Sequence, residues 1–299
     1  MSEALPAAMR VADDTPGRWR RWTEGGGRSL LAHVTLCAVS LLMLYPLLWM
    51  LASSFKPDEE IFGNASIIPE TFTASAYPRG WTGLTVGFGT FFWNSAVIAT
   101  LSVVGNVMSC SLAAYAFARL QFPLKRFWFA LMLGTLMLPY HVTLIPQYVL
   151  FLNLDWVNTI LPLVVPKFLA ADAFFIFLLY QFFRGIPREL DEAAIIDGAG
   201  PWRIYWSVIL PLAIPALTTA AIFTFIWTWD DFFGPLIYLS DIGQYTVQLG
   251  LRSFVDSTGK SDWSALFAMS VVALIPVLLF FVIFQRLLIE GIATTGMKG

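Results

Sequence analysis

The stretch WSALFAMSVVALIPVLLFFVIFQ, residues 263–285, contains no Asp, Glu, Lys or Arg over 23 positions. About 20 apolar residues in a helix cross the roughly 30 Å hydrocarbon core of a bilayer. The stretch therefore predicts a transmembrane helix. Four further windows without these charges predict spans in the same way: Leu30–Phe55, Gly80–Ala118, Phe127–Leu154 and Ile204–Trp229.

A sixth apolar segment, Trp156–Phe183, is less regular because Lys167 and Asp172 lie near its middle. A membrane helix holds such charges when they face protein or water. The sequence therefore predicts an all-α polytopic membrane protein with six transmembrane helices. Charged residues make up 13% of the chain and hydrophobic residues 58%, whereas soluble domains carry about 25% charged residues. This composition argues against a soluble globule and excludes a disordered chain, and a net charge of −2 gives no sign of nucleic-acid binding.

The distribution of basic residues predicts the orientation, because cytoplasmic loops of membrane proteins are enriched in Lys and Arg. Thirteen of the eighteen Lys and Arg residues fall in the two terminal tails and in the loops after the second and fourth spans. Both termini are therefore expected in the cytoplasm. This divides the chain into a cytoplasmic tail at 1–28, a membrane domain at 29–290 and a cytoplasmic tail at 291–299.

The loop between the fourth and fifth spans predicts a short cytoplasmic helix. Pro187 suits the first helical turn, acidic residues follow it at the positive end of the helix dipole, and Gly198 is placed to end the helix. Small residues flanked by carboxylates suit docking into a partner's groove, while a helix that merely separates two spans explains the pattern equally well. One face collects four residues at helical spacing: Leu190, Ala193, Ala194 and Asp197.

Within this loop, EAAIIDGA at residues 192–199 resembles the EAA motif of the permeases of ATP-binding-cassette (ABC) importers. Other segments resemble the MalG-type branch of the carbohydrate permeases, and the resemblance extends over roughly residues 30–299. These segments include Ser54–Pro57, Ala113–Arg119, Pro235–Leu236 and the ending Gly291–Gly299.

The resemblance implies a type I ABC importer fold, with both termini inside, in the plasma (inner) membrane of a bacterium or archaeon. Such a permease works with a second, MalF-type permease subunit, two ATPase subunits and an extracytoplasmic solute-binding protein. ATP and Mg would be bound by the ATPase subunits, and no cofactor by this chain.

The resemblance also implies that the EAA loop is the coupling helix, at about residues 188–199, which docks on an ATPase. Glu192 would meet a basic residue of the ATPase, Gly198 would provide the turn after the helix, and the tail Gly296–Gly299 would reach the same interface. The residues assigned to ATPase coupling are Glu189, Glu192, Ala193, Ala194, Asp197, Gly198 and Ala199.

Charged and aromatic residues in or near the spans are candidates for the substrate path, because intramembrane charge indicates function by default. A structural ion pair with other spans explains Lys167 and Asp172 as well. Five positions apart on an α-helix, these two side chains point about 140° apart, so we expect them not to pair with each other. Aromatic rings and carboxylates suit sugar binding, although an aromatic belt at the membrane interface is an alternative. The path candidates are Lys167, Asp172, Trp229, Asp230, Asp231, Tyr140, His141 and Gln147.

The sequence gives no pattern for a catalytic, nucleotide or metal site. Ser257–Ser261 ends like a P-loop, but the pattern requires a glycine where this chain has Phe254. His33 and His141 form no metal-ligand pattern with the two cysteines, and the separated acids offer no acid–base pair. We therefore expect a transporter subunit rather than an enzyme.

These observations favour a permease subunit that forms, with a second permease, the pathway for a sugar of di- or oligosaccharide size. Two alternatives stay open. One is an importer permease for sn-glycerol 3-phosphate or another polar solute. The other, from a different class, is an ion-coupled secondary transporter that uses Asp172 and Lys167, which would need no ATPase and would leave the EAA loop unexplained.

Overall fold

The computed structural model describes residues 20–63, 66–255 and 261–296, and the side chains of residues 30–63, 66–139, 141–255 and 261–285. Every regular element in these residues is helical, which confirms the predicted all-α class. The chain divides into two compact units, residues 1–50 and 51–299. The predicted tails lie partly outside the described residues, as does most of the P-loop-like segment.

The first unit is the N-terminal part of helix α1 (Arg20–Ser53), and all other helices belong to the second unit. In chain order the second unit contains α2 (Asp58–Gly63), α3 (Ala76–Thr82), α4 (Phe88–Arg119), α5 (Lys125–Thr135), α6 (Tyr140–Asn153), α7 (Leu161–Val164), the 3₁₀ helix η1 (Val165–Leu169), α8 (Ala173–Gly185), α9 (Glu189–Ile196), α10 (Pro201–Ile204), the π-helix η2 (Tyr205–Ile209), α11 (Leu210–Leu212), α12 (Ile214–Trp229), α13 (Phe233–Tyr238), η3 (Ile242–Gln244), α14 (Val247–Leu251), η4 (Arg252–Phe254) and α15 (Trp263–Gly296).

Four helices of the described residues are long and apolar enough to cross a membrane, and a bent pair could form a fifth span. In the bent pair, the segments on either side of Ala213 meet at 78°. Pro211 and Pro215 flank this bend, and each removes a backbone hydrogen-bond donor from the helix. The four segments are Leu30–Ser53, Phe88–Arg119, Leu161–Gly185 and Trp263–Gln285. Of these, Leu161–Gly185 is made up of α7, η1 and α8 in succession.

The third predicted span, Phe127–Leu154, differs from the sequence prediction. It is divided between α5 and α6, of 11 and 14 residues, each shorter than the roughly 20 that a spanning helix needs. The break falls at Pro139, whose ψ of 130° is extended and whose ring also disfavours helix at Leu138. Of the six predicted spans, four therefore correspond to helical segments of sufficient length among the described residues, a fifth to the bent pair, and the third to two shorter helices.

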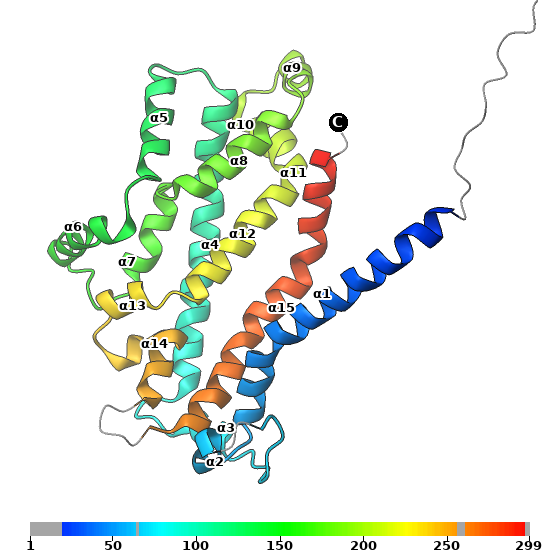
Figure 1. The fold of residues 1–299 in the computed structure, drawn as a ribbon. Helices are drawn as coiled ribbons and strands as arrows, with labels where there is room; N and C mark the ends of the chain where they lie inside the picture. Colours follow the sequence, from blue (N-terminus) through cyan, green and yellow to red (C-terminus); the bar gives the residue numbers. More distant parts are fainter. Residues whose placement is uncertain (1–19, 64–65, 256–260, 297–299) are drawn as a thin grey trace, which may run out of the picture. The chain divides into compact units, whose positions relative to one another are not determined.

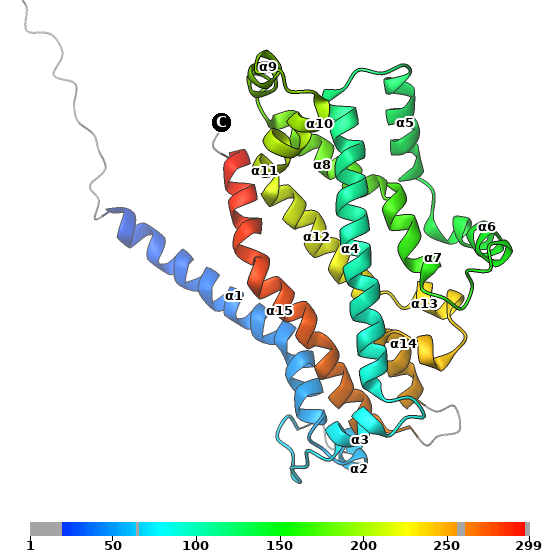
Figure 2. The same ribbon diagram turned by 180° about the vertical axis from the view of Figure 1, so that it is seen from behind.

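Helix α4 is the centre of the second unit and packs against α8, α12 and η1. Figures 1 and 2 both show it running between two ends of the unit. One end, which we call the α9 end, holds α9, the end of α8 and the start of α5; the other, the α3 end, holds α2 and α3. Gly105 permits the close approach of η1 to α4, because a Cβ there would lie 2.5 Å from the ring of Phe168.

The basic residues of the predicted cytoplasmic loops gather at one of these two ends, the α9 end, as the predicted orientation requires. Arg119, Arg126 and Arg184 lie at or near the ends of helices that meet at the α9 end, and α15 also finishes there, which agrees with a C-terminus on the side of the coupling loop. Arg79 lies at the α3 end, where its guanidinium contacts Asp262 at 2.6 and 2.9 Å. Burial is the largest effect and by itself would raise the pKa of Asp262. The hydrogen bonds from Arg79, Ala265 and Ser264, together with the charge of Arg79, outweigh it, so the pKa of Asp262 lies below its usual value.

Candidate docking and translocation sites

Helix α9 is the predicted docking helix, and its end is built as expected. Gly198 has a φ of +80°, a left-handed conformation that glycine adopts without steric cost. Its N–H donates to the carbonyl of Ile195 at 2.9 Å, and the N–H of Ala199 donates to the carbonyl of Ala194 at 2.8 Å. This pair of bonds is a Schellman motif, which satisfies carbonyls that the end of the helix would leave free. The structure thus gives the physical reason for the glycine in the motif.

The two faces of α9 are divided differently from the predicted pattern. Ala193 is exposed, whereas Ala194 and Ala199 pack against the buried cluster at the α9 end. The neighbouring alanines therefore do not share the outward face. Two apolar side chains outside the predicted coupling residues, Ile195 and Ile196, are 59% and 85% exposed. The coupling candidates that remain exposed are Glu189, Glu192, Ala193, Asp197 and Gly198.

A buried ion pair fastens α9 to the end of α4. Nη1 of Arg119 lies 3.2 Å from Oδ2 of Asp191, and the two side chains are only 4% and 15% exposed. Nη2 of the same arginine donates to the carbonyl of Ile186, just before α9, at 2.7 Å. One guanidinium therefore contacts both α9 and the segment that leads into it. Neither Arg119 nor Asp191 was selected as a site residue from the sequence.

Two further residues of α4 continue this connection beyond α9. The hydroxyl of Tyr115 donates to the carbonyl of Pro201 at 2.9 Å, and the hydroxyls of Ser111 and Tyr205 lie 2.7 Å apart. Ser111, Tyr115 and Arg119 are four residues apart and so share one face of the helix. We call these three residues the α4 stripe. The stripe contacts the chain before, within and after α9.

A cavity of about 710 Å³ lies between α6, α7, η1, the residues just before α8, α12 and α13. Four of the predicted path residues line it together: Gln147, Lys167, Asp172 and Asp231. The cavity also includes Trp227, which is 49% exposed and was not selected from the sequence. An aromatic face beside a few polar groups is typical of a small-molecule site.

Lys167 and Asp172 form an ion pair, so the expectation that they would not pair is wrong. Nζ of Lys167 lies 3.2 Å from Oδ2 of Asp172. The angle of about 140° does not apply because the chain is not a continuous α-helix here: η1 ends before Ala170, which has a φ of +51°. Two α4 side chains contact the break: Ser109 donates to the carbonyl of Lys167 at 2.7 Å, and Sγ of Cys110 lies 3.7 Å from the carbonyl oxygen of Asp172.

The remaining path candidates do not line this cavity in the described structure. Trp229 is 2% exposed and its indole N–H donates to the carbonyl of Ala273 at 3.0 Å, which ties α12 to α15. Asp230 is exposed and accepts a hydrogen bond from Gln248. The ring of His141 lies edge-on to that of Phe233. The side chain of Tyr140 lies outside the described residues.

Comparison with known proteins identifies the family of the chain. Residues 105–294 match the family of binding-protein-dependent transport system inner membrane components. The chain therefore belongs to this family, and it is a multi-pass permease component of the inner (plasma) membrane.

Two relatives and one solved structure show how far the similarity extends. The diacetylchitobiose uptake system permease protein NgcG of Streptomyces coelicolor is 33% identical over 86% of this chain and 84% of its own length. The sn-glycerol-3-phosphate transport system permease protein UgpE of Yersinia enterocolitica is 32% identical over 89% of this chain and 96% of its own. The fold is similar to that of a chain of a bacterial ABC transporter that imports alginate, with a TM-score of 0.78, 23% identity, and coverage of 88% of this chain and 97% of that one.

Proposed function

We propose that this chain is one of two permease subunits of an ABC importer and that α9 is the helix through which it meets an ATPase subunit. The observation that carries this proposal is an exposed helix with a fixed orientation. The outward side of α9 presents Glu192 and the apolar Ile196, while Arg119 holds the inward side. The other components would be a second permease, two ATPase subunits that bind ATP and Mg, and a solute-binding protein. This chain would then contribute no catalytic site of its own.

In this proposal the cavity around Trp227 is part of the substrate path. Closure of the ATPase subunits on ATP would favour one of two arrangements of the permeases, because ATP binds that state more tightly. The aromatic ring and the polar groups of Gln147 and Asp231 suit a sugar, which offers both apolar faces and hydroxyls. The diacetylchitobiose system of the relative NgcG supports a substrate of di- or oligosaccharide size.

A glycerol phosphate substrate is the alternative that the relative UgpE supports. The cavity lining argues against it, because Lys167 is already paired with Asp172 and Asp231 adds a second negative charge. A doubly charged phosphate would meet net negative charge there. An ion-coupled secondary transporter would leave the exposed docking helix without a role.

Transport by the reconstituted complex decides among these functions. The chain, its second permease, the ATPase subunits and the binding protein are placed in lipid vesicles loaded with ATP and Mg, and uptake of labelled diacetylchitobiose and of sn-glycerol 3-phosphate is measured. We expect ATP-dependent uptake of the sugar. Uptake without ATP would contradict the importer, and preference for the phosphate would contradict the sugar assignment.

Replacement of Lys167 by methionine is expected to lower sugar uptake about tenfold, which corresponds to roughly 1.4 kcal/mol. The change leaves Asp172 without its cation beside the cavity, and breaking one partner of a partly buried pair is costly. Binding-protein-stimulated ATP hydrolysis should change less than uptake. The exchange Lys167→Asp with Asp172→Lys is the matched control, and recovery of uptake in it would show that the pair, rather than the lysine itself, is required. Unchanged uptake in Lys167→Met would remove this residue from the path.

A further inference from the structure

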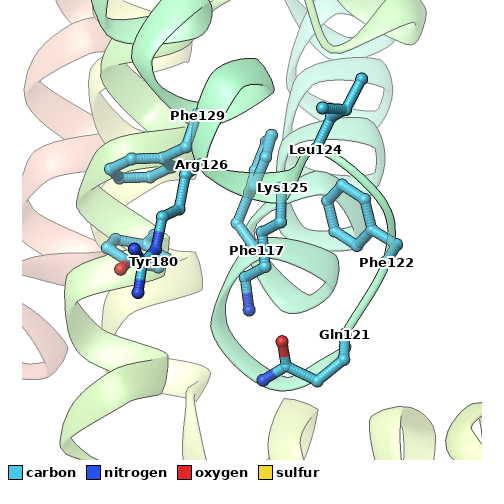
Figure 3. Close-up of a pocket in the computed structure, with 8 residues that line it drawn as sticks. All are labelled: Phe117, Gln121, Phe122, Leu124, Lys125, Arg126, Phe129 and Tyr180. Carbon is cyan, nitrogen blue, oxygen red and sulfur yellow. The ribbon is translucent and has the colours of Figure 1, made fainter.

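A second cavity, of about 550 Å³, lies at the α9 end of the unit, between the ends of α4, α5 and α8. It is separate from both the docking helix and the substrate cavity. Its walls are aromatic: the ring of Phe129 lies 5.4 Å from that of Phe117 and 4.5 Å from that of Tyr180. Figure 3 shows Arg126 and Tyr180 on one side of it, Gln121 and Phe122 on the other, and Lys125 between them in this view.

The charge of this cavity is positive and uncompensated by its own lining. Lys125 and Arg126 line it, and none of its eight described lining residues is acidic. Arg184 adds a third positive charge beside it, with Nη1 3.4 Å from the Tyr180 hydroxyl and the guanidinium over the ring. Burial, and to a smaller extent the charge of Arg188, lowers the pKa of Lys125. An anion in the cavity would relieve this crowding of like charges.

The local backbone also favours an anion. Lys125 begins α5, an 11-residue helix, so the positive end of that helix faces the cavity region. The residue before it, Leu124, is left-handed with a φ of +57°, which turns the chain sharply into the helix. Nζ of Lys125 donates to the carbonyl of Leu120 at 2.7 Å and is thereby held near the loop that closes the cavity.

The surface beyond the cavity is apolar. Along α5, Phe127, Trp128 and Leu131 are 57%, 49% and 52% exposed. In an inner-membrane protein such a face meets acyl chains, and Trp is favoured at the level of the lipid headgroups. A basic pocket and an apolar face on successive turns of one helix match the two parts of a single lipid molecule.

We propose that this cavity binds the phosphate headgroup of an anionic glycerophospholipid, with Lys125 and Arg126 contacting the phosphate. The acyl chains would lie along the exposed face of α5. Basic pockets between membrane helices on the cytoplasmic side bind lipid headgroups in this way. A soluble phosphate has the same charge but gains nothing from the apolar face, so the two sources of phosphate are separable by experiment.

The test uses the full chain in nanodiscs of phosphatidylcholine that contain a small fraction of spin-labelled phosphatidylglycerol. The motionally restricted fraction of the label reports lipid bound to the protein. We expect the wild type to restrict phosphatidylglycerol in preference to spin-labelled phosphatidylcholine, and Lys125→Gln or Arg126→Gln to lower this preference about fivefold each. Arg126→Lys keeps the charge and should retain most of the preference. Arg203→Gln removes one exposed arginine at the same end, outside the cavity, and is the matched control.

Two outcomes would overturn the proposal. Equal loss of preference in Arg203→Gln and Arg126→Gln would mean that the general positive charge of this end, and not the cavity, attracts the lipid. Displacement of the labelled lipid by inorganic phosphate at equal concentration would mean that the cavity takes a free phosphate. Circular dichroism of each variant, compared with the wild type, and the retained preference of Arg126→Lys separate loss of the site from loss of the fold.

Discussion

Replacing Gly198 by proline is expected to abolish ATP-driven transport while the chain still inserts into the membrane. Residue 198 has a φ of +80°, which the proline ring cannot adopt, and its N–H donates to the carbonyl of Ile195. The end of α9 would lose both features, at a local cost of about 3 kcal/mol or more. The outward face that carries Glu192 would then lose its fixed orientation. Uptake and ATP hydrolysis by reconstituted complexes measure the effect, and the amount of chain in isolated membranes measures insertion.

The chain offers a matched control two residues away. Gly200 has a φ of −77° and open space around it, so Gly200→Ala should leave transport unchanged. Transport by Gly198→Ala should lie between that of Gly198→Pro and that of Gly200→Ala, because a left-handed residue with a Cβ costs roughly 1–2 kcal/mol. Glu192→Lys tests the proposed docking face separately. The substitution reverses the charge of an exposed side chain and does not disturb the end of the helix. Normal transport in both Gly198→Pro and Glu192→Lys would show that α9 does not dock on an ATPase.

The position of α9 could be predicted from the sequence because its signals are local. Proline, acids and glycine act on the nearest turn of the chain, and the structure places α9 at Glu189–Ile196, inside the predicted 188–199. Which side of α9 packs inward depends on other helices. Ala193 and Ala194 are adjacent in the sequence, yet only Ala194 meets the buried cluster at the α9 end.

The apolar windows could also be predicted from local sequence, whereas the breaks within them could not be predicted from uncharged length alone. Uncharged length does not reveal that Pro139 divides the third window, although the proline itself was a visible signal. The pairing of Lys167 with Asp172 depends on a left-handed Ala170, for which the sequence carries no glycine or asparagine as a cue.

The cavity around Trp227 is another feature that the sequence alone does not decide. Trp227 and Trp229 are two positions apart, so they point to nearly opposite sides of α12. The structure turns Trp227 into the cavity and buries Trp229 against α15. The sequence shows that both rings exist, but only the packing of α12 decides which one a ligand meets.

Replacing Asp191 by alanine is expected to destabilise the chain by about 3–5 kcal/mol and to reduce transport more than tenfold. The change leaves the 4%-exposed side chain of Arg119 with an unpaired charge, which is the costly way to break a buried pair. Thermal unfolding in detergent and ATP-driven uptake measure the two effects. Arg203→Ala, which removes an exposed arginine from the same end, should change neither.

The double variant Arg119→Met with Asp191→Leu separates stability from position. Nε of Arg119 and Oδ1 of Asp191 are buried without a hydrogen-bond partner in the described part of the chain, so the pair contributes little net stability over apolar side chains. The double variant should therefore recover most of the unfolding temperature. It should not recover transport, because the guanidinium also holds the carbonyl of Ile186 and so fixes the entry of α9 onto α4.

The same helix reaches the substrate cavity from this point. Ser109, which bonds to the carbonyl of Lys167, lies ten residues before Arg119, about 15 Å along the axis of α4. A rigid helix with bonds at both places moves the docking end and the cavity wall together. Loss of the tie at Arg119 should therefore leave ATP hydrolysis by the assembled complex present but no longer dependent on the loaded binding protein. Full transport by the double variant would contradict this coupling and would reduce the ion pair to a replaceable packing contact.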